Sequence, residues 1–295
     1  MFVPIMGRAG AGALPGDVVM ALMVAALVQA CCGWMLPLVI AARGVERLVR
    51  GAALLAAAAL LLVLLTPLGA PYCAERPQRL MLFHTRRTLH APGAADRVEH
   101  FYWVPQLDGN TAQAVHKYVA RGAGARAVSS AECGELVYCG MPYYLPVLSL
   151  IGESYVSPAP EPPLPRLRAS LRLERLNATA LELSVELAGP AHGVLVVAPA
   201  AGVRAAGLRE GARWGARRTY FVALHAARGA AAWRRRVLLL HAPGAELARW
   251  ADVSLAGHAL FGAERLAPAH AALLAGLPDW VAGTGWGVDL HLYRV

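Results

Sequence analysis

Histidine is the side chain in this sequence best suited to bind a metal or transfer a proton, and the chain has ten of them. His84 and His90 are six residues apart, so on a strand both would point to one face. Asp96, Glu99 and His100 follow and could complete a metal site on paper. No motif fixes their geometry, because the chain has neither His-Glu-x-x-His nor Cys-x-x-Cys. We therefore expect no metal site and no resident cofactor. The isolated histidines are interpreted as satisfied surface or core residues: His225, His258 and His291.

Nucleophilic catalysis has no support in the sequence either. There is no Gly-x-Ser-x-Gly elbow, and no cysteine lies in a catalytic motif. The glycines at 122 and 124 lack the spacing of a phosphate-binding loop. We predict no catalytic residue in this chain.

Two features bear on the compartment in which the chain folds. Cys133 and Cys139 are separated by five residues that include Gly134, so a local bridge is feasible if the chain turns back. They would pair in an oxidising lumen and stay reduced in cytosol. Asn177 begins an Asn-Ala-Thr sequon, which is an acceptor for a glycan. Together these features favour a lumenal location, with glycosylation at Asn177.

A lumenal domain with such features needs an anchor, and two apolar runs near the N-terminus supply one. Residues 18–42 contain no charge over 25 positions. As a helix they would measure about 37 Å, enough to cross a hydrocarbon core of about 30 Å. Residues 51–68 form a second uncharged run, and the connector between them holds three arginines and one glutamate. We predict a lead-in segment at 1–17 and a two-helix transmembrane hairpin at 18–70. Its small residues would allow close packing with each other or with further membrane helices.

The remainder of the chain has the pattern of a β-rich domain. Residues 71–156 would form its first part, with strands at 79–85 and 98–104, and residues 157–165 would be a stiff Pro-rich connector. Beyond it apolar and polar residues alternate with a period of two. Seven short strands within 166–295 predict an antiparallel β-sandwich-like C-terminal domain. One or two short helices are expected, at 111–120 and 268–277. The predicted strands of the C-terminal domain lie at 167–174, 181–187, 193–198, 219–225, 236–240, 253–260 and 286–293.

The formal charge of +9 suits a partner that is acidic. Nucleic-acid binding would need basic residues clustered with aromatic ones, whereas here they are scattered apart from residues 234–236. We therefore predict no nucleic-acid partner. The surplus is better suited to acidic headgroups of the lipid bilayer.

Several blocks of this chain resemble the C-terminal region of the endoplasmic reticulum metallopeptidases of the M28 zinc-peptidase family, in the same order and spacing. The resemblance implies a membrane protein of the endoplasmic reticulum, in which the last two membrane helices precede a lumenal domain. In that family a zinc-peptidase domain lies before the helices, and its His, Asp and Glu ligands have no counterpart here. Neither a catalytic residue nor zinc can be carried over. The blocks are Met1–Arg8, Arg86–His90, Cys139–Val147, Pro158–Glu161 and Leu277–Trp280.

Three functional hypotheses follow. The leading one is a non-catalytic membrane anchor and lumenal β domain, which could hold a peptidase domain in a longer relative. A second is that the chain is a fragment of an active aminopeptidase-type zinc hydrolase whose catalytic domain lies upstream. A third is a lumenal receptor or adhesion module, whose protein ligand the sequence does not name.

Overall fold

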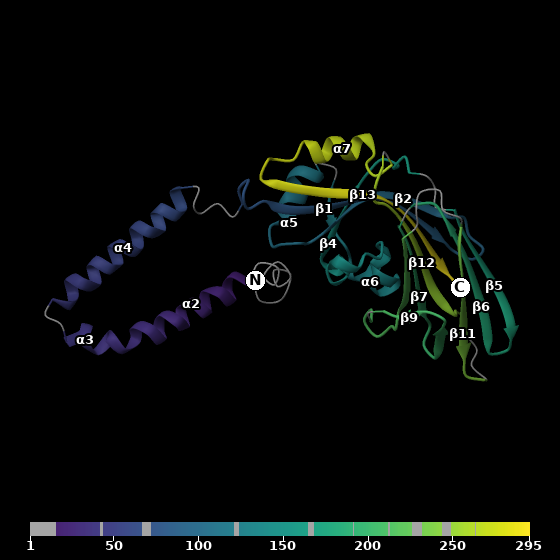
Figure 1. Ribbon diagram of the computed structural model, residues 1–295, viewed down its shortest axis with the longest axis horizontal. Helices are drawn as coiled ribbons and strands as arrows, with labels where there is room; N and C mark the ends of the chain where they lie inside the picture. Colours follow the sequence, from purple (N-terminus) through teal and green to yellow (C-terminus); the bar gives the residue numbers. More distant parts are fainter. Residues whose placement is uncertain are drawn as a thin grey trace. The chain divides into compact units, whose positions relative to one another are not determined.

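A computed structural model of the chain describes residues 16–41, 44–66, 72–120, 124–164, 168–190, 192–211, 213–225, 232–243, 249–262 and 264–295. The chain divides into two compact units (Figure 1). The first comprises residues 1–79 with 107–109 and 278–282, and the second contains the rest. Each unit is considered by itself. Most of the predicted lead-in, residues 1–15, lies outside the described residues.

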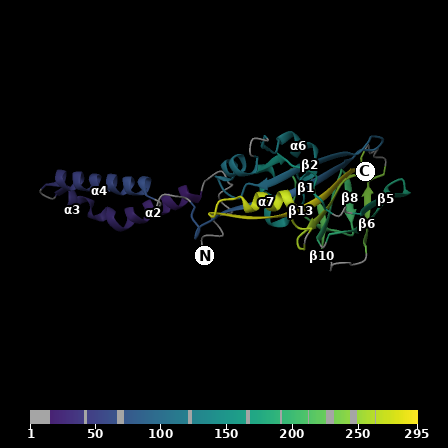
Figure 2. The same ribbon diagram turned by 90° about the horizontal axis from the view of Figure 1, so that it is seen from above.

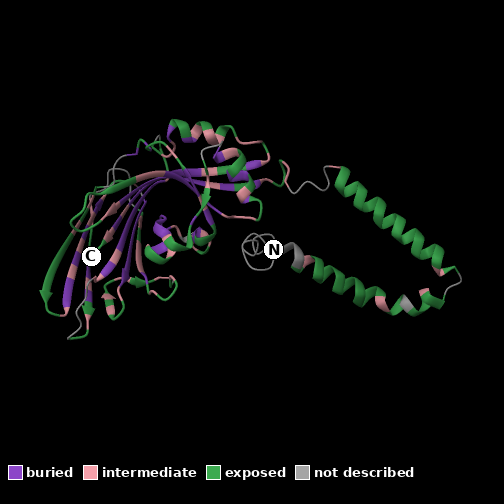
Figure 3. Cartoon of the chain, turned by 180° about the vertical axis from the view of Figure 1, so that it is seen from behind, coloured by how far each residue is buried: buried purple, intermediate pink, exposed green. Residues whose placement is uncertain are grey.

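Helix α4 (Val45–Leu65) is apolar and exposed along its whole length (Figure 3). Its most apolar stretch of 18 residues has a mean hydropathy of 2.5. At about 1.5 Å per residue it is roughly 31 Å long, which matches the hydrocarbon core of a bilayer. It begins six residues earlier than the predicted run, inside the basic connector. Glu46 and Arg50, one turn apart, form an ion pair of 2.6 Å there, and Gly44 precedes the helix in a left-handed conformation (φ 86°).

The run predicted as the first membrane helix is helical through residue 41 but is not one continuous helix. The segment is divided into α2 (Gly16–Cys32), a 3-10 turn η1 (Gly33–Met35) and α3 (Leu36–Ala41). Pro37 explains the break, because it has no N–H to donate and its ring crowds the carbonyl four residues earlier, that of Gly33. With 17 residues, α2 is about 25 Å long, shorter than a bilayer core. Among the described helices, α4 is therefore the one candidate membrane span.

A nine-stranded sheet forms the frame of the second unit, in the order β3-β4-β2-β1-β13-β12-β7-β10-β9 (Figures 1 and 2). Neighbours β1–β2, β2–β4, β12–β13, β7–β12 and β7–β10 pair antiparallel. Strands from before and after the Pro-rich connector thus share one sheet, and β4 itself runs into the connector. The strands are β1 (Gln78–His90), β2 (Arg97–Pro105), β3 (Arg126–Ala127), β4 (Ser154–Pro158), β7 (His192–Pro199), β9 (Arg209–Glu210), β10 (Tyr220–His225), β12 (Ala251–Ala259) and β13 (Val281–Arg294).

A second sheet has four strands in the order β5-β6-β11-β8. It packs against one end of the large sheet, where β6 and β11 face β7 and β12 across an apolar core. This sandwich-like half confirms the predicted mostly β architecture. Its strands are β5 (Arg168–Asn177), β6 (Ala180–Ala188), β8 (Val203–Ala206) and β11 (Trp233–His241). The core contains Leu183, Val185, Leu195, Val197, Val237, Leu239, Val253 and Leu255.

Short helical segments cover the other end of the large sheet. Helix α7 confirms the predicted second helix, with Pro268 in its first turn. The predicted helix at 111–120 is also confirmed, although its second half is a π-helical turn. These segments are α5 (Thr111–Ala114), η3 (Val115–Val119), α6 (Ser130–Glu135), η4 (Val137–Gly140), η5 (Leu145–Glu153) and α7 (Pro268–Ala275).

Candidate functional site

Two successive arginines of β1 point to opposite faces of the large sheet, because side chains alternate along a strand. Arg86 is only 6% exposed. Its Nε donates to Asp289 Oδ1 at 3.0 Å and its Nη2 to Asp289 Oδ2 at 2.7 Å. Glu161 of the Pro-rich connector lies 3.5 Å away. The hydrogen bonds to Asp289 raise the pKa of Arg86, so this guanidinium stays charged and its charge is fully paired.

Arg87, on the other face, is 5% exposed and equally well paired. Its guanidinium donates to Glu99 and to the carbonyl of Gly140 at 3.3 Å, and it lies 3.7 Å from Glu132. It also sits over the ring of Phe101, 5.0 Å from its centroid. Arg87 therefore ties β1 to β2 and to the segment around α6.

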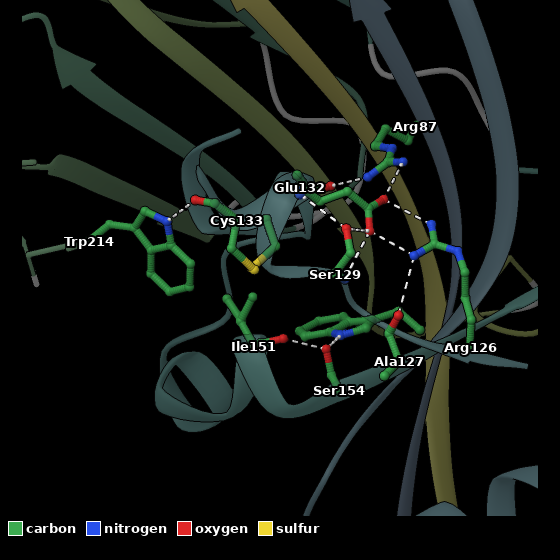
Figure 4. Close-up of a disulfide and its surroundings, with 12 residues drawn as sticks. Arg87, Arg126, Ala127, Ser129, Glu132, Cys133, Ile151, Ser154 and Trp214 are labelled. Carbon is green, nitrogen blue, oxygen red and sulfur yellow. Dashed lines mark hydrogen bonds and ion pairs between the residues drawn. A yellow bond between two sulfur atoms is a disulfide. The ribbon is translucent and has the colours of Figure 1, made fainter. Parts of the chain in front are cut away.

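Helix α6 carries the densest polar network of the second unit (Figure 4). Its capping box is complete, because the Ser129 hydroxyl accepts from the Glu132 amide while the Glu132 carboxylate accepts from the Ser129 amide. The same carboxylate receives two hydrogen bonds from Arg126, at 2.7 and 2.8 Å. These bonds are the main reason that the pKa of Glu132 falls to about 2. Glu132 is thus a fixed anion at neutral pH and not a proton donor.

Cys133 and Cys139 form a disulfide that joins α6 to η4. Cys139 and Tyr138, the residue before it, adopt left-handed φ angles of 54° and 53°. This conformation is costly for residues other than glycine. The Tyr138 hydroxyl shares a 2.7 Å hydrogen bond with Thr219, which helps to hold this turn. The disulfide, the Arg87 contact and this bond together fix the turn between α6 and the sheet.

A cavity of about 370 Å³ lies between α6 and the ends of β1, β12 and β13. Its charged wall includes Arg294, which pairs with Glu135 at 2.6 Å, and the Arg126–Glu132 pair. His90 lies on its edge, stacked on Tyr293 with centroids 4.2 Å apart. The ring nitrogens of His90 are engaged, Nδ1 by Asp96 and Nε2 by His291, both at 2.9 Å. The described lining residues of the cavity combine apolar side chains with equal numbers of arginines and carboxylates.

Of the residues that could complete a metal site, the structure brings His90 and Asp96 together but not the whole set. His84 is buried and its Nε2 donates to Pro160 O at 2.8 Å, whereas His90 lies at the far end of β1. Glu99 is engaged by Arg87 and Arg97. Across the described parts of the chain, no group of three or more His, Cys, Asp or Glu side chains could hold a metal ion.

Two of the histidines interpreted as isolated, His225 and His258, form a row with His192 across neighbouring strands. His225 of β10 pairs with His192 of β7, and His192 pairs with His258 of β12. The row runs from an exposed ring to a fully buried one, whose Nδ1 accepts from the Trp286 indole at 3.1 Å. Burial lowers the pKa of His192 to about 4 and that of His258 to about 3. Only strand register could have shown this row, in which His192 and His258 are neutral core residues at neutral pH.

The sequon lies at the turn between β5 and β6. Asn177 is exposed, and its Oδ1 accepts from the Thr179 amide at 2.9 Å and hydroxyl at 3.1 Å. The side-chain nitrogen thus lies at an open turn. Three cysteines are free: Cys31 and Cys32 in the apolar segment and Cys73 after it.

Comparison with known proteins identifies the fold family. The family described as "Endoplasmic reticulum metallopeptidase 1, C-terminal domain" matches residues 75–293. The chain belongs to this family. Endoplasmic reticulum metallopeptidase 1 from mouse is 27% identical over 307 residues, which cover 99% of this chain and 33% of that protein. The human protein is also 27% identical, over 310 residues with the same coverage. The chain spans about a third of the length of these curated relatives.

Three of the blocks that carry the resemblance to endoplasmic reticulum metallopeptidases meet at the two buried arginines. Arg86 contacts Glu161 of the Pro-rich block, and Arg87 contacts Gly140 of the block that follows α6. In the first unit, Trp280 of another block stacks on Tyr72 with centroids 5.9 Å apart. Sequence reasoning quoted these residues without seeing that they share contacts. Their common role is to join strands and turns.

Proposed function

We propose that this chain is the membrane anchor and non-catalytic lumenal β domain of an endoplasmic reticulum metallopeptidase-like protein. The observation that carries the proposal is the match of residues 75–293 to the C-terminal domain of that family. The apolar, fully exposed α4 supports anchoring, and the arginines and acids of the best-formed cavity are paired with one another. In a longer protein the domain would hold a peptidase domain at the membrane.

Two crossings are part of this proposal. The α2–η1–α3 segment is uncharged from residue 18 to residue 41, and its three helical pieces together span a bilayer although α2 alone does not. A hairpin with two crossings places both ends of the chain on one side. The disulfide and the sequon favour the lumen as that side.

Glycosylation tests the lumenal placement directly. The chain expressed in microsomes is expected to show a glycosidase-sensitive mobility shift that Asn177→Gln abolishes. Thr179→Ser keeps the sequon and is the matched control, so it is expected to keep the shift. The opposite result would place the domain on the cytosolic side of the membrane. In that case the chain would show no shift, and Cys133 and Cys139 would react freely with thiol reagents in intact microsomes.

Zinc content and peptide hydrolysis test the non-catalytic reading. The purified chain is expected to hold less than one zinc ion per molecule and to leave aminopeptidase substrates uncleaved. The second hypothesis, a fragment of an active zinc hydrolase, is favoured by the relatives' name and by their threefold greater length. Genomic sequence upstream of Met1 that encodes zinc ligands with peptidase spacing would support that hypothesis, and the chain alone would then remain inactive.

A further inference from the structure

A second hollow, of about 630 Å³, lies at the start of β12 beside the first cavity, and Asp252 lines both. Its walls come from the β7–β8 turn, the loop between β9 and β10, and the start of β12. Among its described lining residues are four arginines and a single carboxylate, a net charge of +3. These residues are Arg204, Arg217, Arg218, Arg249 and Asp252.

Two of the arginines are held in place by the one carboxylate. Arg217 donates to Asp252 Oδ2 at 2.7 Å, and Arg249 lies 3.1 Å from Asp252 Oδ1. Asp252 therefore places two guanidinium groups side by side while neutralising only one of them. Each guanidinium carries five N–H donors, so donors remain after these bonds are made.

The loop that carries Arg217 is itself fixed. The main chains of Trp214 and Arg217 exchange two hydrogen bonds of 3.0 Å. The Trp214 indole donates to the Cys133 carbonyl at 3.0 Å (Figure 4), and Arg217 reaches the Gly134 carbonyl at 3.4 Å. This anchoring to α6 orders the arginines before any ligand arrives, which reduces the entropy cost of binding.

The other two arginines have no acidic partner among the described residues. Arg204 and Arg218 are exposed, and neither forms an ion pair with a residue that the structure describes. Two buried arginines elsewhere in this unit, Arg86 and Arg87, are each paired with a carboxylate. The rim of the hollow therefore presents positive charge that the fold does not consume.

We propose that this hollow binds a phosphate group carried on a larger polar molecule. The planar guanidinium fork matches phosphate oxygens bidentately, and the net charge of +3 complements a phosphate monoester of about −1.5 to −2. The volume exceeds that of a bare phosphate and lies within the range of small-ligand sites. Tyr220 lines one wall and gives the remainder of the ligand a ring to pack against. The anchoring role plays no part in this inference.

The test is a titration of the detergent-solubilised full chain with three probes. These are inorganic phosphate, water-soluble short-chain phosphatidylinositol phosphate, and short-chain phosphatidylcholine as a zwitterionic control whose phosphodiester carries no net charge with its choline. Saturable binding of the inositol lipid that is tighter than that of inorganic phosphate would identify a lipid headgroup as the source. Equal binding of the two would identify a free phosphate compound. No saturable binding of either phosphate probe would overturn the proposal.

Matched charge reversals separate a built site from general attraction. Arg204→Glu with Arg218→Glu is expected to weaken phosphate binding by about tenfold or more, since two charge-assisted contacts are lost. Arg168→Glu with Arg175→Glu makes the same change in net charge on β5, at the opposite edge of the small sheet from β8, and is expected to leave binding within about twofold. Equal losses in both pairs would show attraction to net charge alone and would also overturn the proposal. All four positions are exposed, so these variants are expected to fold.

Discussion

Removing the charge of Asp289 is the sharpest test of how this domain holds its large sheet together. Asp289 on β13 is 1% exposed and accepts two hydrogen bonds from the buried Arg86 of β1. Asp289→Asn keeps the shape of the side chain but leaves Arg86 charged, because a guanidinium does not lose its proton in a protein. Glu161 is the other nearby acid, at 3.5 Å, and its side chain is 55% exposed.

Breaking a buried ion pair by removing one partner costs about 3–5 kcal/mol, because the remaining charge stays desolvated. For a domain of this size, 1 kcal/mol shifts the melting temperature by about 2–4 °C. We therefore expect Asp289→Asn to lower the Tm by roughly 10 °C, with Glu161 limiting the loss. Tryptophan fluorescence in detergent can follow unfolding, because Trp103 is fully buried on β2 of the same sheet.

Two further variants make the result interpretable. Glu186→Gln removes a carboxylate from an ion pair with Arg234 that is open to solvent, and it is expected to leave the Tm unchanged. The double change Arg86→Met with Asp289→Leu removes both charges and is expected to recover much of the loss. A Tm for Asp289→Asn within about 3 °C of the parent would refute the reasoning, because the pair would then behave like a surface contact.

Two other predictions concern the neutral histidines and the Pro-rich connector. Because folding lowers the pKa of His192, His258 and His270 to about 4, 3 and 4 from an ordinary 6.5, the unfolded chain takes up their protons first as pH falls. The contribution of these neutral rings to the free energy of unfolding is therefore fully present above pH 6.5 and is lost as the pH falls towards 4. The free energy of unfolding decreases by up to about 1.4 kcal/mol per pH unit for each ring. Denaturant titrations at several pH values measure the slope of the free energy of unfolding against pH. His258→Gln is expected to reduce the number of protons taken up on unfolding by about one. An unchanged slope would exclude His258 as a contributor. Gly287→Ala is expected to destabilise the domain by about 1–3 kcal/mol in urea titrations, because the added Cβ would lie 2.3 Å from Leu164 of the connector. Gly152→Ala, where nothing lies within 4 Å of the added atom, is its control, and equal effects would show that the connector is not packed at Gly287.

The strands could be predicted well from sequence because their burial pattern is local. Residues 181–187 alternate between the core and the outer face of β6, as their period of two indicates. The prediction at 286–293 likewise lies within β13, although that strand begins at Val281. The sheet order was beyond such reasoning. Nothing near β1 in the sequence indicates that Arg86 meets Asp289, 203 residues later.

In the membrane segment the break between helices is local, and an uncharged composition says little about where a helix is divided. Residues 18–42 are apolar throughout, so hydropathy alone describes one long helix. A single Pro37 divides it, because the cost of proline in a helix is a matter of backbone geometry and not of polarity. The start of α4 at Val45 was missed for a related reason. Charged residues such as Glu46 and Arg50 suit a helix end near a bilayer surface as well as they suit a loop.

Paired and unpaired charges separate structural from functional residues in this domain. The sequence offered three histidines and two acids as candidates for chemistry, and the structure engages several of them within the fold: Glu99 pairs with Arg87, and His84 with a backbone carbonyl. A buried charge that is fully paired contributes to the architecture and has little left for a ligand. Arg204 and Arg218 were passed over because basic residues were scattered along the chain, yet strand β8 and the β9–β10 loop bring them to one hollow. Charge that the fold gathers and leaves unpaired is the better indication of a binding site here.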